Sequence, residues 1–310
     1  MKRILLLAVF TLLCLTACKQ DNTANAPVIL KVGVMSSMDY VPLAVAQKLN
    51  LFKKYNVIVE IQKFYSANDR DAAFQSGAID GTVIDYTGAI LQKNGGMDLK
   101  ITSACNSTFA LMTAGNSGIT KLSDLKGKKI SVSRNTVIDF CIDMALQSVT
   151  LTADDVKKQE INKIPIRFEM LLKGETDATA LPDPFMTIAT SKDAKTLVKM
   201  DELGYAVTGI MFRTNAINEK TKEIDAFYKA YNEAVDYISS HKIDDIKDIL
   251  VAEIGFPKPL ISSVILPTYT HAELPNTKDI QKVVQWLQAK KLIENVDMKD
   301  IFDERFVKNK

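Results

Sequence analysis

The sequence predicts an α/β protein whose chain forms two lobes, and three features lead to this fold class. Short apolar runs alternate with helix-like segments from residue 28 to about residue 212, which is typical of sheets with helical crossovers. The segment GNSGIT, residues 115–120, interrupts this alternation with two glycines and a serine. From Asn218 onward long helical patterns replace the strands. A chain that leaves one unit, builds a second and returns predicts two lobes joined by two crossings.

The first unit is expected to follow the right-handed order of strand, helix and strand. Runs rich in Val and Ile predict the strands, and apolar residues three and four positions apart predict the helices. The predicted strands are residues 28–34, 57–64, 79–84, 98–104 and 109–114, and the predicted helices are residues 41–51, 69–76 and 88–93.

The second unit repeats this order, and a helical region follows it. Its predicted strands are residues 129–133, 159–164, 178–181 and 196–200, and its predicted helices are residues 137–148, 166–172 and 185–191. Residues 205–212 are expected to return to the first unit. The predicted helices after them are residues 219–240, 244–253, 258–266 and 278–289.

The N-terminal residues have the pattern of an export signal. Lys2 and Arg3 precede an apolar run that is about half of the ~20 residues a membrane span requires. The following LTAC, residues 15–18, resembles a bacterial lipobox, in which the cysteine is lipidated after cleavage. We expect a signal peptide at residues 1–17, lipidation of Cys18, a tether at residues 18–27 and a place on the outer face of the membrane. The alternative is an ordinary signal peptide with an incidental cysteine.

The charges of the mature chain argue against nucleic acid as a partner. Cleavage after residue 17 removes Lys2 and Arg3, which leaves 37 basic and 37 acidic residues. No basic cluster with interleaved aromatic residues stands out in the sequence. Cys105 and Cys141 are the cysteines that remain beside Cys18, and they could form one disulfide or stay as two buried thiols.

Several segments, in matching order, resemble one family. They are VPLAVAQKLNLFKKYNVIVE (residues 41–60), SGAIDGTVIDYTGAI (76–90), LSDLKGKKISVSRNT (122–136) and GETDATALPDPF (174–185). They resemble the substrate-binding proteins of ABC importers with the type 2 periplasmic-binding fold, in the branch that serves sulfonates, taurine, nitrate and thiamine pyrimidine precursors. The resemblance covers about residues 28–300. Asn50 and Asn56 stand where the family usually has glycine, and asparagine also tolerates a left-handed turn.

The resemblance implies how the lobes are assembled and what they do. Lobe 1 is expected to consist of residues 28–114 and 213–310, with the helical C-terminal part packed on it, and lobe 2 of residues 115–212. The hinge crossings are expected near residues 114–119 and 207–212. Such a protein would work as a monomer without cofactor or metal, and would deliver a small ligand to a membrane permease driven by an ATPase.

Polar residues after the predicted lobe 1 strands are candidates for ligand contacts, because ligands of such folds sit at the carboxyl ends of strands. The candidates are Ser36, Ser37, Asp39, Tyr40, Tyr65, Asn68, Asp85, Tyr86, Thr87 and Asn106. The competing interpretation is that several of these side chains only cap the helices that follow and that Asn106 lies in a surface turn.

Lobe 2 offers two candidate segments. SVSRNTVID, residues 131–139, runs from a strand into a helix, so free backbone N–H groups at the helix start favour an anion. In LPDPF the resemblance implies an acid that faces the ligand or the hinge. The candidates are Ser133, Arg134, Asn135, Thr136, Asp183 and Phe185. The alternatives are a capped helix with a solvated arginine, a capping role for Asp183 and a core position for Phe185.

The acids among these candidates indicate a ligand chemistry. Asp39, Asp85 and Asp183 would place three carboxylates near one cleft, opposite at most one arginine. Because buried carboxylates need partners, the ligand would carry amino or ring N–H donors. This favours a thiamine-pyrimidine-like or other N-heterocycle, with taurine or an alkanesulfonate as the alternative.

Catalytic and metal-binding motifs are missing from the sequence. It contains no HExxH, GxSxG, Walker or CxxC pattern, and its two histidines, His241 and His271, are expected to face solvent. The sequence therefore predicts a receptor and not an enzyme. The alternatives of another class are a pyrimidine-precursor biosynthetic enzyme of the same fold and a sensor that presents a ligand to a membrane partner.

Overall fold

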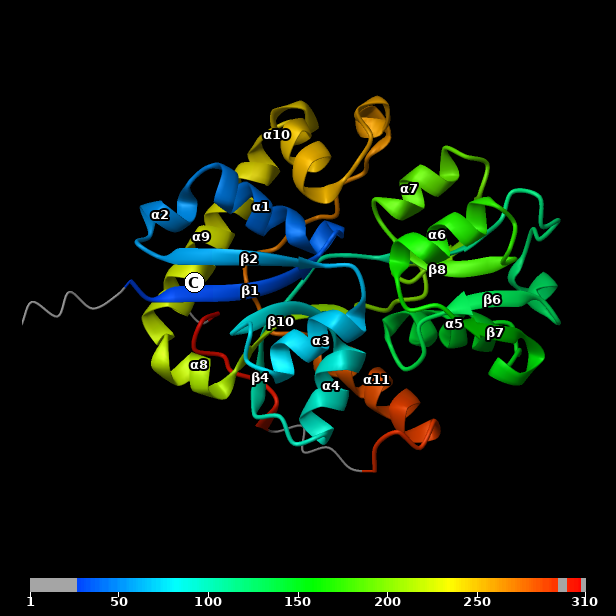
Figure 1. Ribbon diagram of the computed structural model, residues 1–310, viewed down its shortest axis with the longest axis horizontal. Helices are drawn as coiled ribbons and strands as arrows, with labels where there is room; N and C mark the ends of the chain where they lie inside the picture. Colours follow the sequence, from blue (N-terminus) through cyan, green and yellow to red (C-terminus); the bar gives the residue numbers. More distant parts are fainter. Residues whose placement is uncertain (1–26, 295–299, 308–310) are drawn as a thin grey trace, which may run out of the picture.

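The computed structural model describes residues 27–294 and 300–307. The predicted signal peptide, Cys18 and almost all of the predicted tether lie outside the described residues. Two five-stranded sheets form two lobes, with lobe 1 on the left and lobe 2 on the right of Figure 1. This is the two-lobe α/β architecture that the sequence predicts.

The lobe 1 sheet has the strand order β2-β1-β3-β10-β4. β1 is parallel to β2 and β3, whereas β10 runs antiparallel between β3 and β4. The strands are β1 (Ile29–Met35), β2 (Ile58–Phe64), β3 (Gly81–Asp85), β4 (Leu99–Ala104) and β10 (Thr208–Arg213), and the helices between them are α1 (Val41–Lys48), α2 (Leu51–Lys54), α3 (Ala67–Gln75) and α4 (Tyr86–Asn94).

The lobe 2 sheet repeats this plan in the order β7-β6-β8-β5-β9. β6 is parallel to β7 and β8, and β5 runs antiparallel between β8 and β9. The strands are β5 (Phe109–Thr113), β6 (Lys129–Val132), β7 (Lys157–Glu160), β8 (Ala178–Pro182) and β9 (Lys195–Lys199), and the helices are α5 (Val137–Gln147), α6 (Ile164–Leu172) and α7 (Phe185–Thr190).

The predicted lobe boundaries need two corrections. β5 was expected to end lobe 1, but its register with β8 and β9 places it in the lobe 2 sheet. The first crossing therefore lies at residues 105–108 and not near residues 114–119. β10 lies in the lobe 1 sheet, so the second crossing is at residues 200–207 and not at residues 207–212. In both places the membership of a strand is decided by its partners, which are distant in the sequence.

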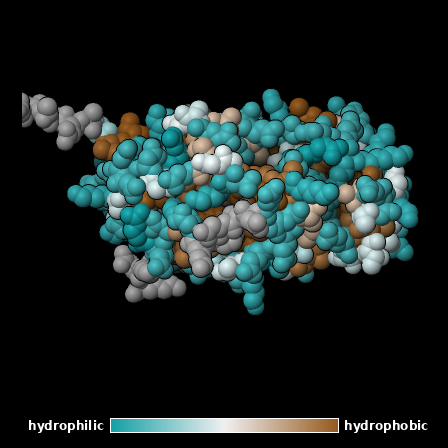
Figure 2. Space-filling model, turned by 90° about the horizontal axis from the view of Figure 1, so that it is seen from below, coloured by the Kyte–Doolittle hydropathy of each residue, from teal (hydrophilic) through white to brown (hydrophobic). Residues whose placement is uncertain are grey.

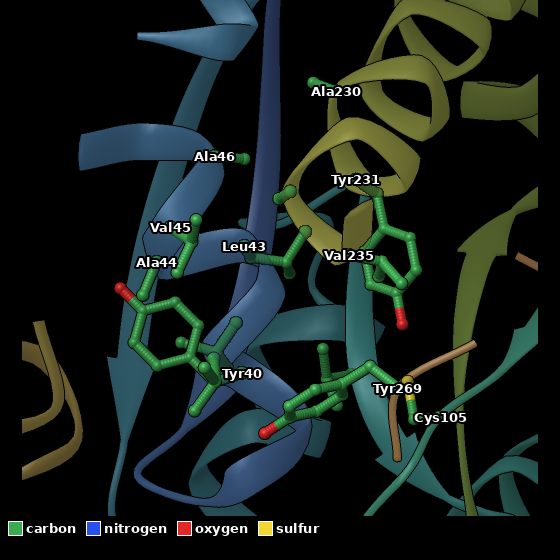
Figure 3. Packing of buried hydrophobic residues seen from close by; sticks show 14 of the residues in the cluster. Tyr40, Leu43, Ala44, Val45, Ala46, Cys105, Ala230, Tyr231, Val235 and Tyr269 are labelled. Atoms are coloured by element: carbon green, nitrogen blue, oxygen red, sulfur yellow. The ribbon is translucent and has the colours of Figure 1, made fainter. Parts of the chain in front are cut away.

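The helical C-terminal region packs mainly on lobe 1, as predicted. α1 and α9 lie side by side, and their buried side chains, among them Tyr231 of α9, form one core with Tyr269 (Figure 3). The helices are α8 (Thr214–Glu219), α9 (Thr221–Ser240), α10 (Ile243–Ile249) and α11 (Thr277–Ala289), with a short π-helix at Leu250–Ile254 and a 3-10 helix at Lys258–Ser263. Residues 258–266 were expected to form an α-helix, and only part of them form the 3-10 helix.

α11 connects the two lobes. The segments before and after it are tied to β4 of lobe 1, where the Ala104 N–H donates to the Glu273 carbonyl and the Ile101 N–H to the Ile301 carbonyl. The other face of α11 packs on α5 of lobe 2, where Trp286 meets Phe140 edge to face at 5.5 Å between ring centroids. α11 therefore spans the interface between the lobes below the sheets in Figure 1.

A buried ionic network reinforces this connection. Lys158 of β7 and Lys290, directly after α11, both contact Asp139 of α5, each with a 2.5 Å bond from Nζ to a carboxylate oxygen. Lys158 also pairs with Asp143. The Trp286 Nε1–H donates to Asp143 at 2.9 Å. We call these five residues the α11 latch.

Two details of the local structure agree with sequence-based expectations, and one alternative is settled. Asn50 and Asn56 have φ angles of 57° and 56°, the left-handed conformation for which the family usually employs glycine. Cys105 and Cys141 are buried free thiols, so they do not form the disulfide that was one of two possibilities.

The outer surface is mainly hydrophilic on the face shown in Figure 2. No helix in the described ranges combines the length and the apolar character that crossing a membrane would need.

Candidate functional site

A cavity of about 50 Å³ lies between the lobes, where the carboxyl ends of strands from both sheets meet. Most of its wall is apolar, with Met35, Val83 and Ile84 from lobe 1 and Phe109, Val137, Ile138, Ile164 and Pro182 from lobe 2. Its polar lining is formed by Ser37, Asp39, Arg70, Asp85, Thr208, Ser133, Thr136, Asn162 and Arg167. We call it the central cavity. An apolar wall with a few polar groups is typical of a small-molecule site.

Asp85 and Arg70 form a buried ion pair in the lobe 1 wall. Asp85 ends β3 and caps α4, where its Oδ1 accepts the Gly88 N–H at 2.9 Å and the Thr87 hydroxyl. Arg70 of α3 donates to Asp85 Oδ2 at 3.1 Å and to Asp71 at 2.8 Å. Burial alone would raise the pKa of Asp85, but the Arg70 charge and the hydrogen bonds outweigh it and hold the pKa below its ordinary value. Both charged groups are therefore satisfied within the protein.

Asp39 lies in the same wall with a different environment. It follows β1 in a 3-10 turn, Met38–Tyr40, and only 5% of its surface is exposed. The Ser37 hydroxyl donates to one of its oxygens. Burial raises the pKa of Asp39 to about 6, although the Ser37 hydrogen bond and the Arg70 charge act in the opposite direction.

The lobe 2 wall presents hydroxyl and amide groups. Ser133 follows β6 and donates to the Asn162 side chain at 3.1 Å. Thr136 caps α5, because its hydroxyl oxygen accepts the Ile138 N–H at 3.2 Å. Thr136 therefore both caps α5 and lines the cavity, and its contact with a ligand stays a prediction.

Arg167 is the most unusual group of the central cavity. It lies on α6 and is completely buried. Its Nη1 donates to the carbonyls of Ile161 and Asn162 at 2.8 and 3.0 Å. Its Nε and Nη2 have no hydrogen-bond partner among the described residues. Burial lowers the pKa of Arg167 to about 10, and no carboxylate among the described residues compensates this cost with an ion pair.

Several candidate residues lie in the packed interior of lobe 1 and not at the central cavity. Tyr40 belongs to the core beside α1 (Figure 3), and its hydroxyl donates to Glu253 at 3.2 Å. Tyr86 is buried in a core cluster that spans both lobes. Ser36 is half-buried next to the cavity-lining Ser37. The Thr87 hydroxyl donates a hydrogen bond to Asp85, which lines the cavity.

Other candidates line a second, outer cleft of about 630 Å³ between the lobes. Asn68 of α3 faces Arg134 and Asn135 across it, and the Arg70 and Asp85 pair separates it from the central cavity. Arg134 is exposed and pairs with Glu160 at 3.6 Å. Tyr65 is 56% exposed, and its carbonyl accepts the Ile164 N–H across the lobes at 3.3 Å.

A third cavity, of about 450 Å³, lies beside the two crossings. It contains Asn106 and Asp183. Asn106 Oδ1 accepts the Thr270 N–H at 3.1 Å, and Asp183 Oδ1 accepts the Thr187 N–H at 2.8 Å at the start of α7. This second bond is the capping role that competed with ligand binding for Asp183. Phe185 packs on Phe168 of α6 with 5.4 Å between ring centroids, which is a core position.

The two cavity-lining arginines were missed by the sequence reasoning. Both occur inside predicted helices, where an arginine usually faces solvent. A usable signal existed, because Arg167 lies three residues after Ile164 and four before Leu171, on the apolar stripe of α6. Arg70 likewise lies four residues before Phe74, and these two are the buried residues of α3. A charged residue on an apolar stripe therefore indicates a buried charge.

Fold and site together define a class: a two-lobe periplasmic-binding fold with a cavity between its lobes. The family model described as NMT1/THI5 like matches residues 37–245, about two thirds of the sequence. The chain therefore belongs to the NMT1/THI5-like family.

Individual relatives cover nearly all of the chain. A Bacillus subtilis protein provisionally named for binding aliphatic sulfonates is 25% identical over 99% of this chain and 96% of its own. The ligand-binding component of an ABC-type import system from Staphylococcus aureus has a TM-score of 0.79 at 15% identity, covering 91% of this chain and 98% of its own.

Two further solved structures show the range of the fold. The alkanesulfonate-binding protein of Xanthomonas axonopodis, bound to MOPS, has a TM-score of 0.75 at 16% identity, with 88% and 96% of the two chains covered. The desulfurization enzyme DSZB has a TM-score of 0.70 at 13% identity, with 91% and 98% covered. The fold thus occurs in binding proteins and in an enzyme.

Proposed function

We propose that this chain is the substrate-binding component of an ABC importer and that it captures a small sulfonate between its lobes. The observation that carries the proposal is the buried guanidinium of Arg167, which lines the central cavity with two nitrogen atoms unpartnered among the described residues. The names of the Bacillus subtilis relative and of the Xanthomonas structure support the same ligand class.

The chemistry of Arg167 explains why the ligand is an acid. A buried charge without a counterion is costly, and an anionic ligand removes this cost when it binds. The planar guanidinium presents N–H groups as a fork that matches two oxygens of a sulfonate, carboxylate or phosphate. The apolar wall suits a short aliphatic chain, which favours an aliphatic sulfonate over nitrate.

This ligand replaces the N-heterocycle favoured from the sequence. That preference rested on three acids and at most one arginine at the cleft. The premise is wrong, because the central cavity is lined by Asp39 and Asp85 together with Arg70 and Arg167, while Asp183 lines the cavity beside the crossings. A heterocycle remains in the ligand panel as the outcome that would contradict the proposal.

The proposal includes the partners expected from the sequence. The protein would act as a monomer, tethered through lipidated Cys18 to the outer face of the membrane. It would hand its ligand to a permease and an ATPase. Closure would follow from a hinge motion at residues 105–108 and 200–207, with ligand shifting the open and closed populations.

An enzymatic function has less support from the site. DSZB shows that the fold accommodates catalysis. The wall of the central cavity, as far as the described residues define it, contains neither histidine nor cysteine. His241 and His271 are both exposed on the C-terminal helical region, where His271 pairs with Asp236 at 2.7 Å. Binding therefore fits this cavity better than bond cleavage.

The test compares ligands and arginine variants by titration calorimetry. Ethanesulfonate, propanesulfonate, nitrate and an aminopyrimidine are titrated into the wild type, Arg167→Met and Arg167→Lys, with Arg305→Met as the control. Arg305 is a half-exposed arginine paired with Asp303, outside all three cavities. We expect a sulfonate to bind, and Arg167→Met to weaken it at least ~30-fold, about 2 kcal/mol. The sulfonate affinity of Arg167→Lys should lie between those of the wild type and Arg167→Met, because lysine keeps the positive charge but lacks the paired N–H donors of the guanidinium.

Binding of the aminopyrimidine alone would overturn the ligand class. Unchanged sulfonate affinity in Arg167→Met would remove Arg167 from the site. Circular dichroism of each variant checks that a loss of affinity does not come from unfolding.

A further inference from the structure

The amino ends of β1 and β2 carry exposed apolar side chains at one end of lobe 1. Ile29 and Ile58 are register partners on these parallel strands, and Val28 directly precedes Ile29. Val28 is 45%, Ile29 37% and Ile58 49% exposed. Leu49, which is 36% exposed, follows α1. We call Val28, Ile29, Leu49 and Ile58 the tether-end patch, because the described chain begins here.

A surface cleft of about 490 Å³ connects these residues. Ile58 lines it, and so do Gln47 and Asn50, which flank Leu49 in the sequence. Further apolar side chains of the same cleft are those of Phe52, Val57 and Val59. Leu49 therefore lies near Ile58, and hydrophobic residues are visible in brown at this end of the molecule in Figure 2.

The tether-end patch differs from the other exposed apolar residues. Seven large hydrophobic residues are exposed among those that the structure describes, and four of them form this patch. The other three lie apart from it: Tyr65 follows the carboxyl end of β2, Ile166 is on α6 of lobe 2, and Ile265 lies beside the crossings. Single exposed hydrophobic residues are ordinary, whereas a group of neighbours indicates a contact surface.

Hydrogen bonds fix the strand that carries the patch. Asp80 Oδ2 accepts the Lys31 N–H at 2.7 Å and pairs with Lys220 Nζ at 2.7 Å. Lys220 also donates to the Ile29 carbonyl at 2.8 Å. The first residues of β1 are thus tied to the sheet, which holds Ile29 beside Ile58 with both side chains exposed.

The charges next to the patch cancel each other. Lys31 and Glu60 are exposed register partners, two residues beyond Ile29 and Ile58 and on the same face of the sheet. A partner of this surface is therefore selected by apolar contact and not by net charge.

The position of the patch indicates which partner covers it. Nine residues, 19–27, separate the expected lipidation site Cys18 from Val28. Nine residues reach at most ~30 Å when fully extended. A lipid at Cys18 would therefore keep the patch within this distance of the bilayer. The central cavity begins at the other end of β1, at Met35, roughly 20 Å further along the strand.

We propose that the tether-end patch lies against the lipid surface of the membrane and forms a second contact beside the lipid of Cys18. This role rests on the proposed anchored receptor, because the lipid brings the patch to the bilayer. The aliphatic side chains would enter the boundary between headgroups and acyl chains, as the apolar faces of peripheral proteins do. The contact turns the amino ends of β1 and β2 toward the bilayer and leaves the central cavity on the side away from it.

The test measures binding to vesicles with a deliberately weak anchor. The mature chain, residues 18–310, is alkylated at Cys18 with a maleimide that carries one myristyl chain, because a single such chain gives only marginal membrane binding. Cys105 and Cys141 are buried thiols, so the reaction is selective for Cys18. Co-sedimentation with phosphatidylcholine vesicles gives the partition constant.

The patch variant is Ile29→Thr/Ile58→Thr, which keeps β-branched side chains in the strands. The matched control is Ile166→Thr/Ile265→Thr, the same change at two exposed isoleucines outside the patch. We expect the patch variant to bind the vesicles at least ~10-fold more weakly than the wild type, about 1.4 kcal/mol. The control should bind like the wild type.

Two results would contradict the membrane contact. Equal partition of the wild type and the patch variant would remove the patch from the membrane. An equal loss in the control would show that any exposed apolar residue suffices. Sedimentation velocity without lipid adds a third check, because a wild-type dimer that the patch variant dissociates would assign the patch to a second copy of this chain. Circular dichroism verifies that both variants fold.

Mass spectrometry separates this role from the function on which it rests. Protein made with its own signal peptide in a bacterium that processes lipoproteins should carry its lipid on Cys18. An unmodified Cys18 would remove the anchor and overturn the membrane contact with it. Sulfonate binding is measured without a membrane, so the receptor function stands or fails independently of the patch.

Discussion

Two buried arginines of the central cavity differ in the partners that their surroundings provide. Arg70 has two carboxylate partners, Asp71 and Asp85, which raise its pKa against the opposing effect of burial. For Arg167, burial is the one effect on the pKa, which it lowers to about 10. The first arginine is paired within lobe 1, whereas the second keeps two nitrogen atoms without a partner among the described residues, and the anion proposed above would pair them.

Asp39 gives a prediction for the empty protein. Its pKa is raised by burial from 3.8 to about 6, so the folded state holds a proton that the unfolded chain has released between these pH values. Stability from this group therefore falls as the pH rises from about 4 to 6, and the penalty remains above pH 6. A shift of this size corresponds to an upper limit of about 3 kcal/mol. Asp39→Asn is expected to raise the free energy of unfolding by ~1–3 kcal/mol at pH 7.5.

Urea unfolding of the wild type and Asp39→Asn at pH 7.5 and pH 4.5 measures this effect. The gain should shrink strongly at pH 4.5, where Asp39 is protonated in the folded protein. A gain of the same size at both pH values would show that the substitution acts through packing. In that case the charge of Asp39 carries no cost.

Some individual residues of the central cavity were predicted from the sequence. Ser37, Asp39, Asp85, Ser133 and Thr136 were candidates because they follow strands, and all five line the central cavity. Strand ends are visible in a sequence through its periodicity. The burial of Arg70 and Arg167 depends on which helix face meets the other lobe, and a local pattern records this only as a charge on an apolar stripe. Ligand contacts of all these residues stay predictions.

Among the elements, α11 has a role that its sequence does not reveal. It is an amphipathic helix whose flanking segments pair with β4 of lobe 1, yet Trp286 and Lys290 contact α5 of lobe 2. Asp139 is completely buried, and burial opposes its charge, but Lys158 and Lys290 hold its pKa below the ordinary value. Separating α11 from α5 would leave two carboxylates with Lys158 alone.

Lys290→Ala is expected to weaken the α11 latch. It removes one of two cations that face Asp139 and Asp143, so α5 and α11 should separate more readily and the open form should gain population. We expect a lower melting temperature and a three- to tenfold weaker ligand affinity, about 1 kcal/mol. Thermal unfolding and titration calorimetry measure the two effects.

Lys278→Ala is the matched control, because Lys278 is an exposed lysine at the start of the same helix. It should change neither quantity. If Lys290→Ala lowers the melting temperature and leaves affinity unchanged, the latch stabilises the fold without favouring closure.

The elements themselves were predicted more reliably than their assembly. Apart from the α-helix expected at residues 258–266, the strands and helices fall within a few residues of the expected ranges, because periodicity is a local property. β5 was assigned to the wrong lobe, since a five-residue apolar strand fits either sheet until its partners are known. The left-handed turns at Asn50 and Asn56 were predictable, because few residue types accept that conformation.

In the whole molecule, one hydrophobic core extends across the boundary between the lobes. One cluster joins Phe74 and Tyr86 of lobe 1 with Ile130 and Phe140 of lobe 2, and Trp286 completes it. The two-lobe class was visible in the sequence as two α/β units and a return. The continuity of this core could not be predicted from the sequence, because it depends on how closely the lobes approach each other.

Because of this shared core we expect the two lobes to unfold together. Scanning calorimetry of residues 27–310 should show one cooperative transition, with equal calorimetric and van't Hoff enthalpies. A bound ligand at 100 times its Kd should add about 2.7 kcal/mol of stability and move that single transition upward. Two separate transitions would show that the lobes are energetically independent.

The place of Trp286 has a practical consequence. It is the one tryptophan of the sequence, its indole lies against Phe140 of the other lobe, and its N–H is bound to a buried carboxylate. Any motion that parts α11 from α5 changes the polarity and quenching around this single emitter. If the lobes open by the hinge motion proposed above, the tryptophan emission of unlabelled protein should shift, and this shift is an optical measure of lobe opening.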